Sequence, residues 1–269
     1  MAVVSAHRVF HLLLGVVYLI AFASLLVQFD GLLSYNGLLP VDLHVERLRR
    51  HAAQATRGLS SQQRALVLFK SFGSLVVIAP ELGVSPDALC LTLLFIGLTC
   101  STLITFLGLH RNFLFFLCWA AYLSLQAVGQ TWLSFQWDIL LLEVGFLAIL
   151  SSTFFHSSTS YTPITWCYRF LAWKLMFLSG VVKLQSQCPT WEGLTALQYH
   201  FATQCLPTPL AWFAHQLPPV ILKAGVAATL LIEIPWTFLI IMPFRTVRRI
   251  GVVLQVTYCL FSTMSFNES

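Results

Sequence analysis

The chain has 269 residues, of which 58% are hydrophobic and 9% are charged, and its formal net charge is +5. Soluble domains carry about 25% charged residues, and disordered chains and small disulfide scaffolds also differ from this composition. The basic residues form no run interleaved with aromatics, so we expect no nucleic acid partner. The composition instead indicates an all-α, polytopic membrane helical bundle that contacts the lipid bilayer.

Apolar blocks about as long as a bilayer is thick recur along the sequence. We expect about seven transmembrane helices in one domain over residues 1–269, at 9–29, 88–109, 113–128, 139–155, 164–182, 220–242 and 250–266. The first block follows Arg8 and contains the triplet AFA at 21–23, so a cleaved signal peptide is the alternative to a retained anchor. We favour the anchor because the apolar run continues through Val27.

Basic residues between the blocks predict the orientation, because positive charge is enriched on the cytosolic side. If all seven blocks cross, Arg8, Arg111 and the arginines at 245, 248 and 249 fall on one side, which should be cytosolic. The loops at about 30–87 and 183–219 are then lumenal. The first loop holds several arginines that oppose this assignment, although its acidic residues partly offset them.

The 30–87 loop should contain amphipathic interfacial helices. Apolar residues at helical spacing follow Pro40, namely Val41, Val45, Leu48 and Ala52. Ser60 and Gln63 form a capping-box pattern for a second helix through Ala79. Lys70 and Gly73 interrupt that helix, so we expect it to be interfacial or re-entrant. If it crossed the membrane, every downstream element would invert.

The 183–219 loop is the most distinctive region that is not uniformly apolar. Thr190 could cap a helix that aligns Trp191, Leu194, Leu197 and Phe201 along one side. Prolines then flank Trp212 and Phe213. We predict that these six apolar and aromatic residues bind a client protein, with interfacial packing against the membrane as the alternative. If the loop is lumenal, Cys188 and Cys205 could form a disulfide.

Charged residues within or beside the apolar blocks should turn inward and pair, because each costs a few kcal/mol when it faces lipid. We expect a buried charge network of Asp138, Glu143, Arg169, Lys174, Lys183 and Glu233. Along the predicted 164–182 helix and its next residue, helical spacing places Arg169, Trp173, Met176, Gly180 and Lys183 on one face. Structural pairing that fixes helix register is the favoured interpretation, and a polar functional cavity is the alternative.

Standard catalytic and nucleotide-binding signatures are absent from the sequence, including the P-loop, GxSxG, HExxH and CxxC. His7 and His11 have a spacing that could hold a metal, but no third ligand lies nearby in the sequence. We therefore expect no catalytic residues, no metal and no cofactor. A transporter is a weaker hypothesis, because the charges are few and no pair of broken helices is visible.

Three strings resemble the lipase maturation factor family: FQWDILLLEVGFLAIL (135–150), RFLAWKLMFLSGVVKL (169–184) and CPTWEGLTALQYHFATQCLPTPLAWFAHQLP (188–218). The segment AFASLLVQFDGLLSYNGLLP at 21–40 fits the family's N-terminal part, and the match is closer to the second of its two main branches. Because family members continue into a large lumenal C-terminal region, we expect this chain to be a truncated form.

The resemblance implies a multi-pass endoplasmic reticulum membrane protein that helps secreted lipases fold and assemble into dimers. It implies secreted lipases as clients, with endoplasmic reticulum chaperones or oxidoreductases as further partners. A more distant likeness links GVVKL (180–184) and Trp191 to the vitamin K-dependent gamma-carboxylase. Lys183 would then occupy the position of a catalytic base, so an intramembrane enzyme is the alternative to a non-enzymatic folding factor.

Overall fold

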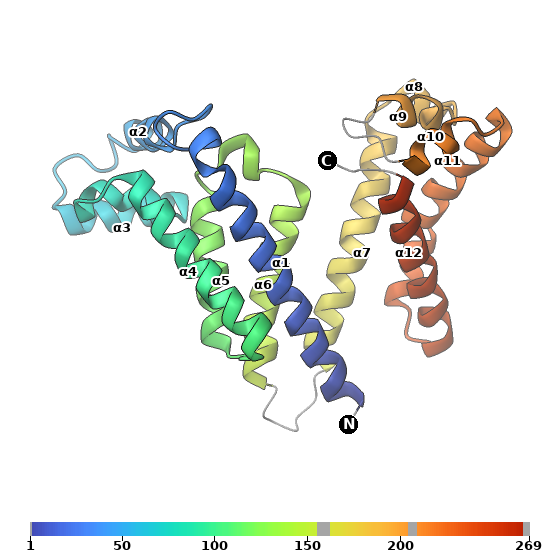
Figure 1. The fold of residues 1–269 in the computed structure, drawn as a ribbon, viewed down its shortest axis with the longest axis horizontal. Coiled ribbons are helices and arrows are strands. Elements are labelled where there is room, and N and C mark those ends of the chain that lie inside the picture. Colours follow the sequence, from blue (N-terminus) through green and yellow to red (C-terminus); the bar gives the residue numbers. More distant parts are fainter. Residues whose placement is uncertain (1, 155–161, 204–208, 266–269) are drawn as a thin grey trace. The chain divides into compact units, whose positions relative to one another are not determined.

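The computed structural model describes residues 2–154, 162–203 and 209–265 (Figure 1). Every regular element within these ranges is a helix, so the predicted all-α fold is confirmed. The chain divides into two compact units, Met1–Ile164 and Thr165–Ser269. Each unit has its own buried apolar cluster. The prediction of a single domain over residues 1–269 stays a prediction.

The first unit is built on four long helices (Figure 1). These are α1 (Ala2–Leu32), α4 (Pro86–Leu107), α5 (Asn112–Gln126) and α6 (Gln136–Phe154). Helix α1 packs on α4, α4 on α5, and α5 on α6. Between α1 and α4 lie α2 (Val41–His51), α3 (Ser61–Phe72) and η1 (Val76–Leu82), and η2 (Gln130–Leu133) precedes α6.

Aromatic side chains fill the core of this unit where a glycine gives them room. Tyr18 and Phe22 on α1 are fully buried, and Tyr122 on α5 meets the Phe22 ring edge-on at 5.7 Å between centroids. A Cβ at Gly97 of α4 would lie 2.3 Å from the Phe22 ring, so only glycine permits this approach. The close packing of α1 against α4 therefore depends on Gly97.

The two ends of the segment between α1 and α4 lie close together. The Tyr35 backbone N–H, just past the end of α1, donates a hydrogen bond to Asp87 in the first turn of α4 (2.9 Å). Val41 and Val45 of α2 are buried, as their helical spacing predicted. Helix α2 therefore lies against the bundle, where it contacts α4 and η1.

Helix α3 begins at the predicted capping box, in which the Ser60 hydroxyl accepts from the Gln63 N–H and the Gln63 side chain accepts from the Ser60 N–H. Its predicted end at Ala79 is wrong. The helix ends at Phe72, because Gly73 adopts a left-handed conformation (φ 65°) that stops it. Twelve residues span about 18 Å, which is too short to cross a bilayer core of about 30 Å.

The second unit begins with α7 (Thr162–Gln185), which three short helices follow. The chain then turns back through α11 (Pro219–Glu233) and η3 (Trp236–Ile241) and ends with α12 (Arg245–Ser265). The short helices are α8 (Pro189–Glu192), α9 (Ala196–Thr203) and α10 (Pro209–His215). Buried side chains of α9 and α10 form a cluster with Leu222 and Val226 of α11, and Trp191 of α8 packs against it. The short helices thus share one apolar cluster with the start of α11.

Within the described residues, each of the seven predicted spans overlaps a helix, and the 220–242 span is divided between α11 and η3. Among the described residues, three stretches are both long and apolar enough to cross a membrane: Ala6–Leu32, Pro86–Leu107 and Pro219–Ile241. Helix α5 is apolar but has only 15 residues. The number of crossings predicted from the sequence is therefore established in part, and seven stays a prediction.

Replacing Gly97 with Ala should lower the free energy of unfolding by about 1–3 kcal/mol, because the added methyl group overlaps the buried Phe22 ring. Thermal unfolding in detergent measures this loss. Gly31→Ala is the matched control, since a Cβ there meets nothing within 4 Å. Because alanine has the higher helix propensity, the control should be no less stable than the unchanged chain. An equal loss of stability in both variants would contradict packing against Phe22 as the cause.

Candidate functional site

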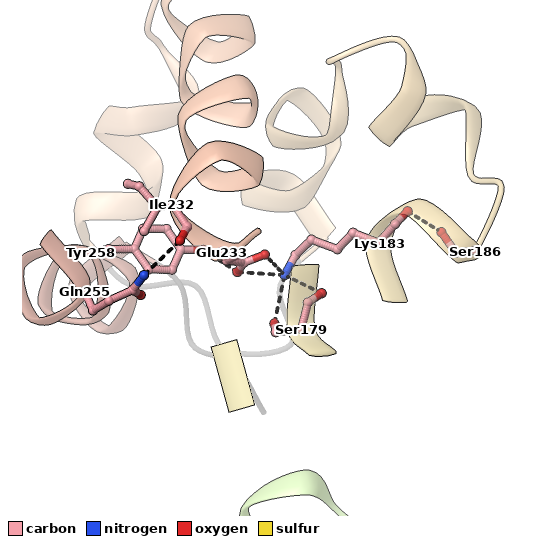
Figure 2. Close-up of polar contacts among 7 residues, drawn as sticks. All are labelled: Ser179, Lys183, Ser186, Ile232, Glu233, Gln255 and Tyr258. Carbon is pink, nitrogen blue, oxygen red and sulfur yellow. Dashed lines mark hydrogen bonds and ion pairs between the residues drawn. The ribbon is translucent and has the colours of Figure 1, made fainter. Parts of the chain in front are cut away.

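An ion pair with a buried carboxylate joins α7 and α11 in the second unit (Figure 2). Glu233, the last residue of α11, is 2% exposed. The Lys183 ammonium on α7 donates to both of its carboxylate oxygens, at 2.8 and 2.9 Å. Lys183 also donates to the Ser179 hydroxyl (3.0 Å), and the Tyr258 hydroxyl on α12 donates to Glu233 (2.8 Å). One carboxylate thus joins three helices.

Glu233 lies where the predicted 220–242 span is broken. Pro235 has no N–H to continue the helix, so α11 ends and the short 3₁₀ helix η3 begins. The break frees the Ile232 carbonyl, which accepts a hydrogen bond from the Gln255 side chain of α12 (2.8 Å, Figure 2). Sequence reasoning missed both the break and the Gln255 contact, although a proline inside an apolar block was a usable signal.

The predicted face of α7 packs against this break. A Cβ at Gly180 would lie 2.6 Å from Ile234 and 2.9 Å from the Glu233 Cβ, so glycine lets the two segments touch. About two helical turns before Gly180 on α7, the Trp173 ring meets the Phe238 ring of η3 edge-on, at 5.4 Å between centroids. The lysine, the glycine and the tryptophan therefore contact one partner segment along their shared face.

Trp191 connects the ion pair to the segment that follows α7. The Lys183 ammonium lies 5.4 Å from the centre of the Trp191 ring, within the range of a cation–π contact. The predicted helix capped by Thr190 is wrong. Cys188 precedes α8, which ends after one turn, and Leu194 then takes a left-handed conformation (φ 55°) before α9 begins.

The six predicted client-binding residues therefore differ in what they can contact. Leu197 and Phe201 are buried in the cluster on α11, and Trp191 and Leu194 are half-buried against it. Trp212 and Phe213 on α10 are 62% and 63% exposed, and their rings meet edge-on. Trp212 and Phe213 are thus the most exposed of the six, and client binding by these residues stays a prediction.

Cys188 is half-buried between α7 and α8, and its thiol lies 3.0 Å from the Thr190 hydroxyl. Hydrogen bonds from the Thr190 side chain and backbone lower the pKa of the Cys188 thiol. A lower pKa increases the share of thiolate, which is the reactive form. Cys205 lies outside the described residues, so its pairing with Cys188 stays a prediction.

The other residues of the predicted charge network are distributed over both units. In the first unit, Asp138 is 4% exposed and accepts hydrogen bonds from the Tyr122 hydroxyl (2.6 Å) and the Phe135 N–H (3.1 Å). Glu143 lies on α6, and Lys174 lies on α7. In the second unit, the Arg169 guanidinium stacks over the Trp166 ring at 4.9 Å. A network that joins all six residues stays a prediction.

Comparison with known proteins decides the family. The family described as "Lipase maturation factor transmembrane domain" matches residues 5–269. This chain belongs to the lipase maturation factor family. It is 40% identical to lipase maturation factor 2 of Xenopus tropicalis over 260 residues, which cover 93% of the chain. The human lipase maturation factor 2 is also 40% identical, and mouse lipase maturation factor 1 is 27% identical over 95% of the chain.

The resemblance of the sequence to the lipase maturation factor family is thus confirmed, and the chain is a membrane protein. The match covers 35% of the Xenopus relative and 36% of the human one, so the chain spans about a third of the length of these relatives. No solved structure matches the chain. The family's matched part contains both the ion pair and the exposed aromatic pair.

Replacing Glu233 with Leu should lower the free energy of unfolding by about 3 kcal/mol, because the half-buried Lys183 ammonium loses its counter-ion. The double variant Lys183→Met/Glu233→Leu should recover most of that loss, since both charges are gone and the volumes are similar. Thermal unfolding in detergent compares the two. A double variant no more stable than Glu233→Leu would show that the charges are not coupled.

Proposed function

We propose that this chain is the membrane part of a non-enzymatic factor that helps secreted lipases fold and assemble into dimers. Its relatives are named lipase maturation factors, and the family model that matches is a transmembrane domain. The site of action that we propose is the lumenal side of the endoplasmic reticulum membrane. Chaperones or oxidoreductases of that compartment would act with it.

The observation that carries the proposal is the exposed aromatic pair on a fixed helix. Ala211 of α10 is fully buried against α11, while its neighbours Trp212 and Phe213 are largely exposed. Helix α10 also contacts α9 and α12. Large aromatic side chains on a rigid support lose little conformational freedom when a partner covers them, and such residues often dominate binding energy.

An intramembrane enzyme that uses Lys183 as a base has less support. A base must be a neutral amine, and a neutral Lys183 would leave the buried Glu233 carboxylate without its counter-ion. Four oxygens already surround the ammonium, two from the Glu233 carboxylate and two from the hydroxyl and backbone carbonyl of Ser179. The geometry favours a structural role for Lys183, in which it fixes α7 on α11.

Replacing Trp212 or Phe213 with Ala should weaken capture of a secreted lipase such as lipoprotein lipase by about tenfold or more. The measurement is co-purification of the lipase from cells that express it with the chain, together with secreted lipase activity. Phe244→Ala is the matched control, because this residue is 69% exposed but lies between η3 and α12. Equal losses in Phe244→Ala would contradict a specific surface on α10.

The same assay separates the folding factor from the enzyme. Lys183→Met/Glu233→Leu removes the amine without leaving a buried unpaired charge, so protein level and capture should stay near those of the unchanged chain. Secreted lipase activity should also persist if Lys183 is structural. Loss of that activity at normal protein level and normal capture would overturn the non-enzymatic proposal.

Seven crossings with a lumenal α8–α10 segment complete the proposal, and glycosylation in microsomes tests it. A flexible insert that carries an acceptor sequon should be modified after Gln187, between α7 and α8. The same insert after Pro243 should stay unmodified, because the arginines that follow it favour the cytosolic side. The reverse pattern would overturn the orientation.

A further inference from the structure

A cavity of about 380 Å³ lies between α2 and α3 of the first unit, and three arginines contribute to its wall. Arg49 comes from α2, Arg57 from the turn after α2, and Arg64 from α3. Leu68 of α3 is buried beside them. The volume falls in the range of about 300–1,000 Å³ that is typical of small-molecule sites.

Only part of this positive charge is neutralised. Arg49 donates two hydrogen bonds to Glu81, at 2.5 and 2.7 Å, and a third to the Val77 carbonyl. In the part of the chain that the structure describes, no carboxylate lies within ion-pair distance of Arg57 or Arg64. The sequence has no acidic residue between Glu46 and Glu81. Among the described residues, these two guanidinium groups therefore have no carboxylate partner, although Arg64 donates one hydrogen bond to the Leu59 carbonyl (3.3 Å).

The chemistry of these groups identifies the ligand class. Guanidinium groups hold phosphate oxygens through paired N–H donors, and two uncompensated charges match a phosphate monoester, whose charge is about −1.5 to −2 at neutral pH. The Thr56 hydroxyl, also in the wall, already donates to the Ala52 carbonyl. Recognition would therefore be mainly electrostatic and would come from the arginines.

The surroundings of the cavity identify the source of the phosphate. Leu66 and Phe69, on the side of α3 away from Arg64 and Leu68, are 54% and 41% exposed. The segment also follows one candidate span, which ends at Leu32, and precedes another, which starts at Pro86. A short helix with exposed apolar residues and basic residues at the end of membrane spans is typical of the headgroup region.

We propose that this cavity binds the phosphate of an anionic phospholipid headgroup, with a phosphomonoester lipid such as phosphatidic acid as its best ligand. Arg57 and Arg64 bind the phosphate, and the Arg49–Glu81 pair holds the wall in place. The site belongs to the first unit and uses no residue of the α10 surface. Its failure would therefore leave the proposed lipase maturation function untouched.

Native mass spectrometry of the full chain in a neutral detergent tests the site. Phosphatidic acid should bind more tightly than phosphatidylcholine with the same acyl chains. Arg57→Gln and Arg64→Gln should each weaken that binding by about tenfold. Arg47→Gln is the matched control, because it removes the same charge from an exposed position on α2 that does not line the cavity. It should leave binding unchanged.

Two further arms make each outcome decisive. Arg64→Lys keeps the charge but loses the paired donors, so it should bind more weakly than the unchanged chain and more tightly than Arg64→Gln. Glycerol 3-phosphate, which lacks the acyl chains, should compete only weakly. Equal competition by it would overturn the lipid source. Equal binding of the two lipids, or an equal loss in Arg47→Gln, would overturn the site itself.

Discussion

The carboxylate of Glu233 is the constraint on which the second unit depends. A charge this deeply buried has to be paired and hydrogen-bonded, or the helix that carries it does not keep its place. Lys183 supplies the opposite charge from α7, and Tyr258 supplies a hydrogen bond from α12. Because the lysine reaches both carboxylate oxygens, it fixes the register of α7 on α11. The same lysine contacts Trp191, so the ion pair also positions the short helices.

The first unit is held together by different means. Its core consists mainly of apolar and aromatic side chains, and close contact between α1 and α4 relies on the absence of a side chain at Gly97. Asp138 is buried there too, but a tyrosine hydroxyl and a backbone N–H satisfy it. Close packing at a glycine is therefore common to both units, at Gly97 in the first and Gly180 in the second. The second unit adds to it the charge pair of Lys183 and Glu233.

Local features of the structure could be predicted from the sequence, and contacts between distant residues could not. Apolar block lengths indicated where helices lie, and Ser60 with Gln63 marked the start of α3. The partnership of Glu233 with Tyr258 has no local signal, since it depends on how α12 folds back. The left-handed conformation of Leu194, which divides α8 from α9, is uncommon for a leucine and opposes its propensity. Three arginines of the first loop line one cavity, and this grouping is visible only in three dimensions.

The hydrogen bond between Tyr35 and Asp87 brings together the two ends of the segment between α1 and α4. The fifty or so residues of this segment therefore leave and return at the same end of the helix pair. Helix α4 packs on α1 from this point, so the two helices run antiparallel. A change in the length of the connecting segment need not alter that arrangement. The segment that carries the arginine cavity is thus free to diversify, while α1 and α4 keep their packing.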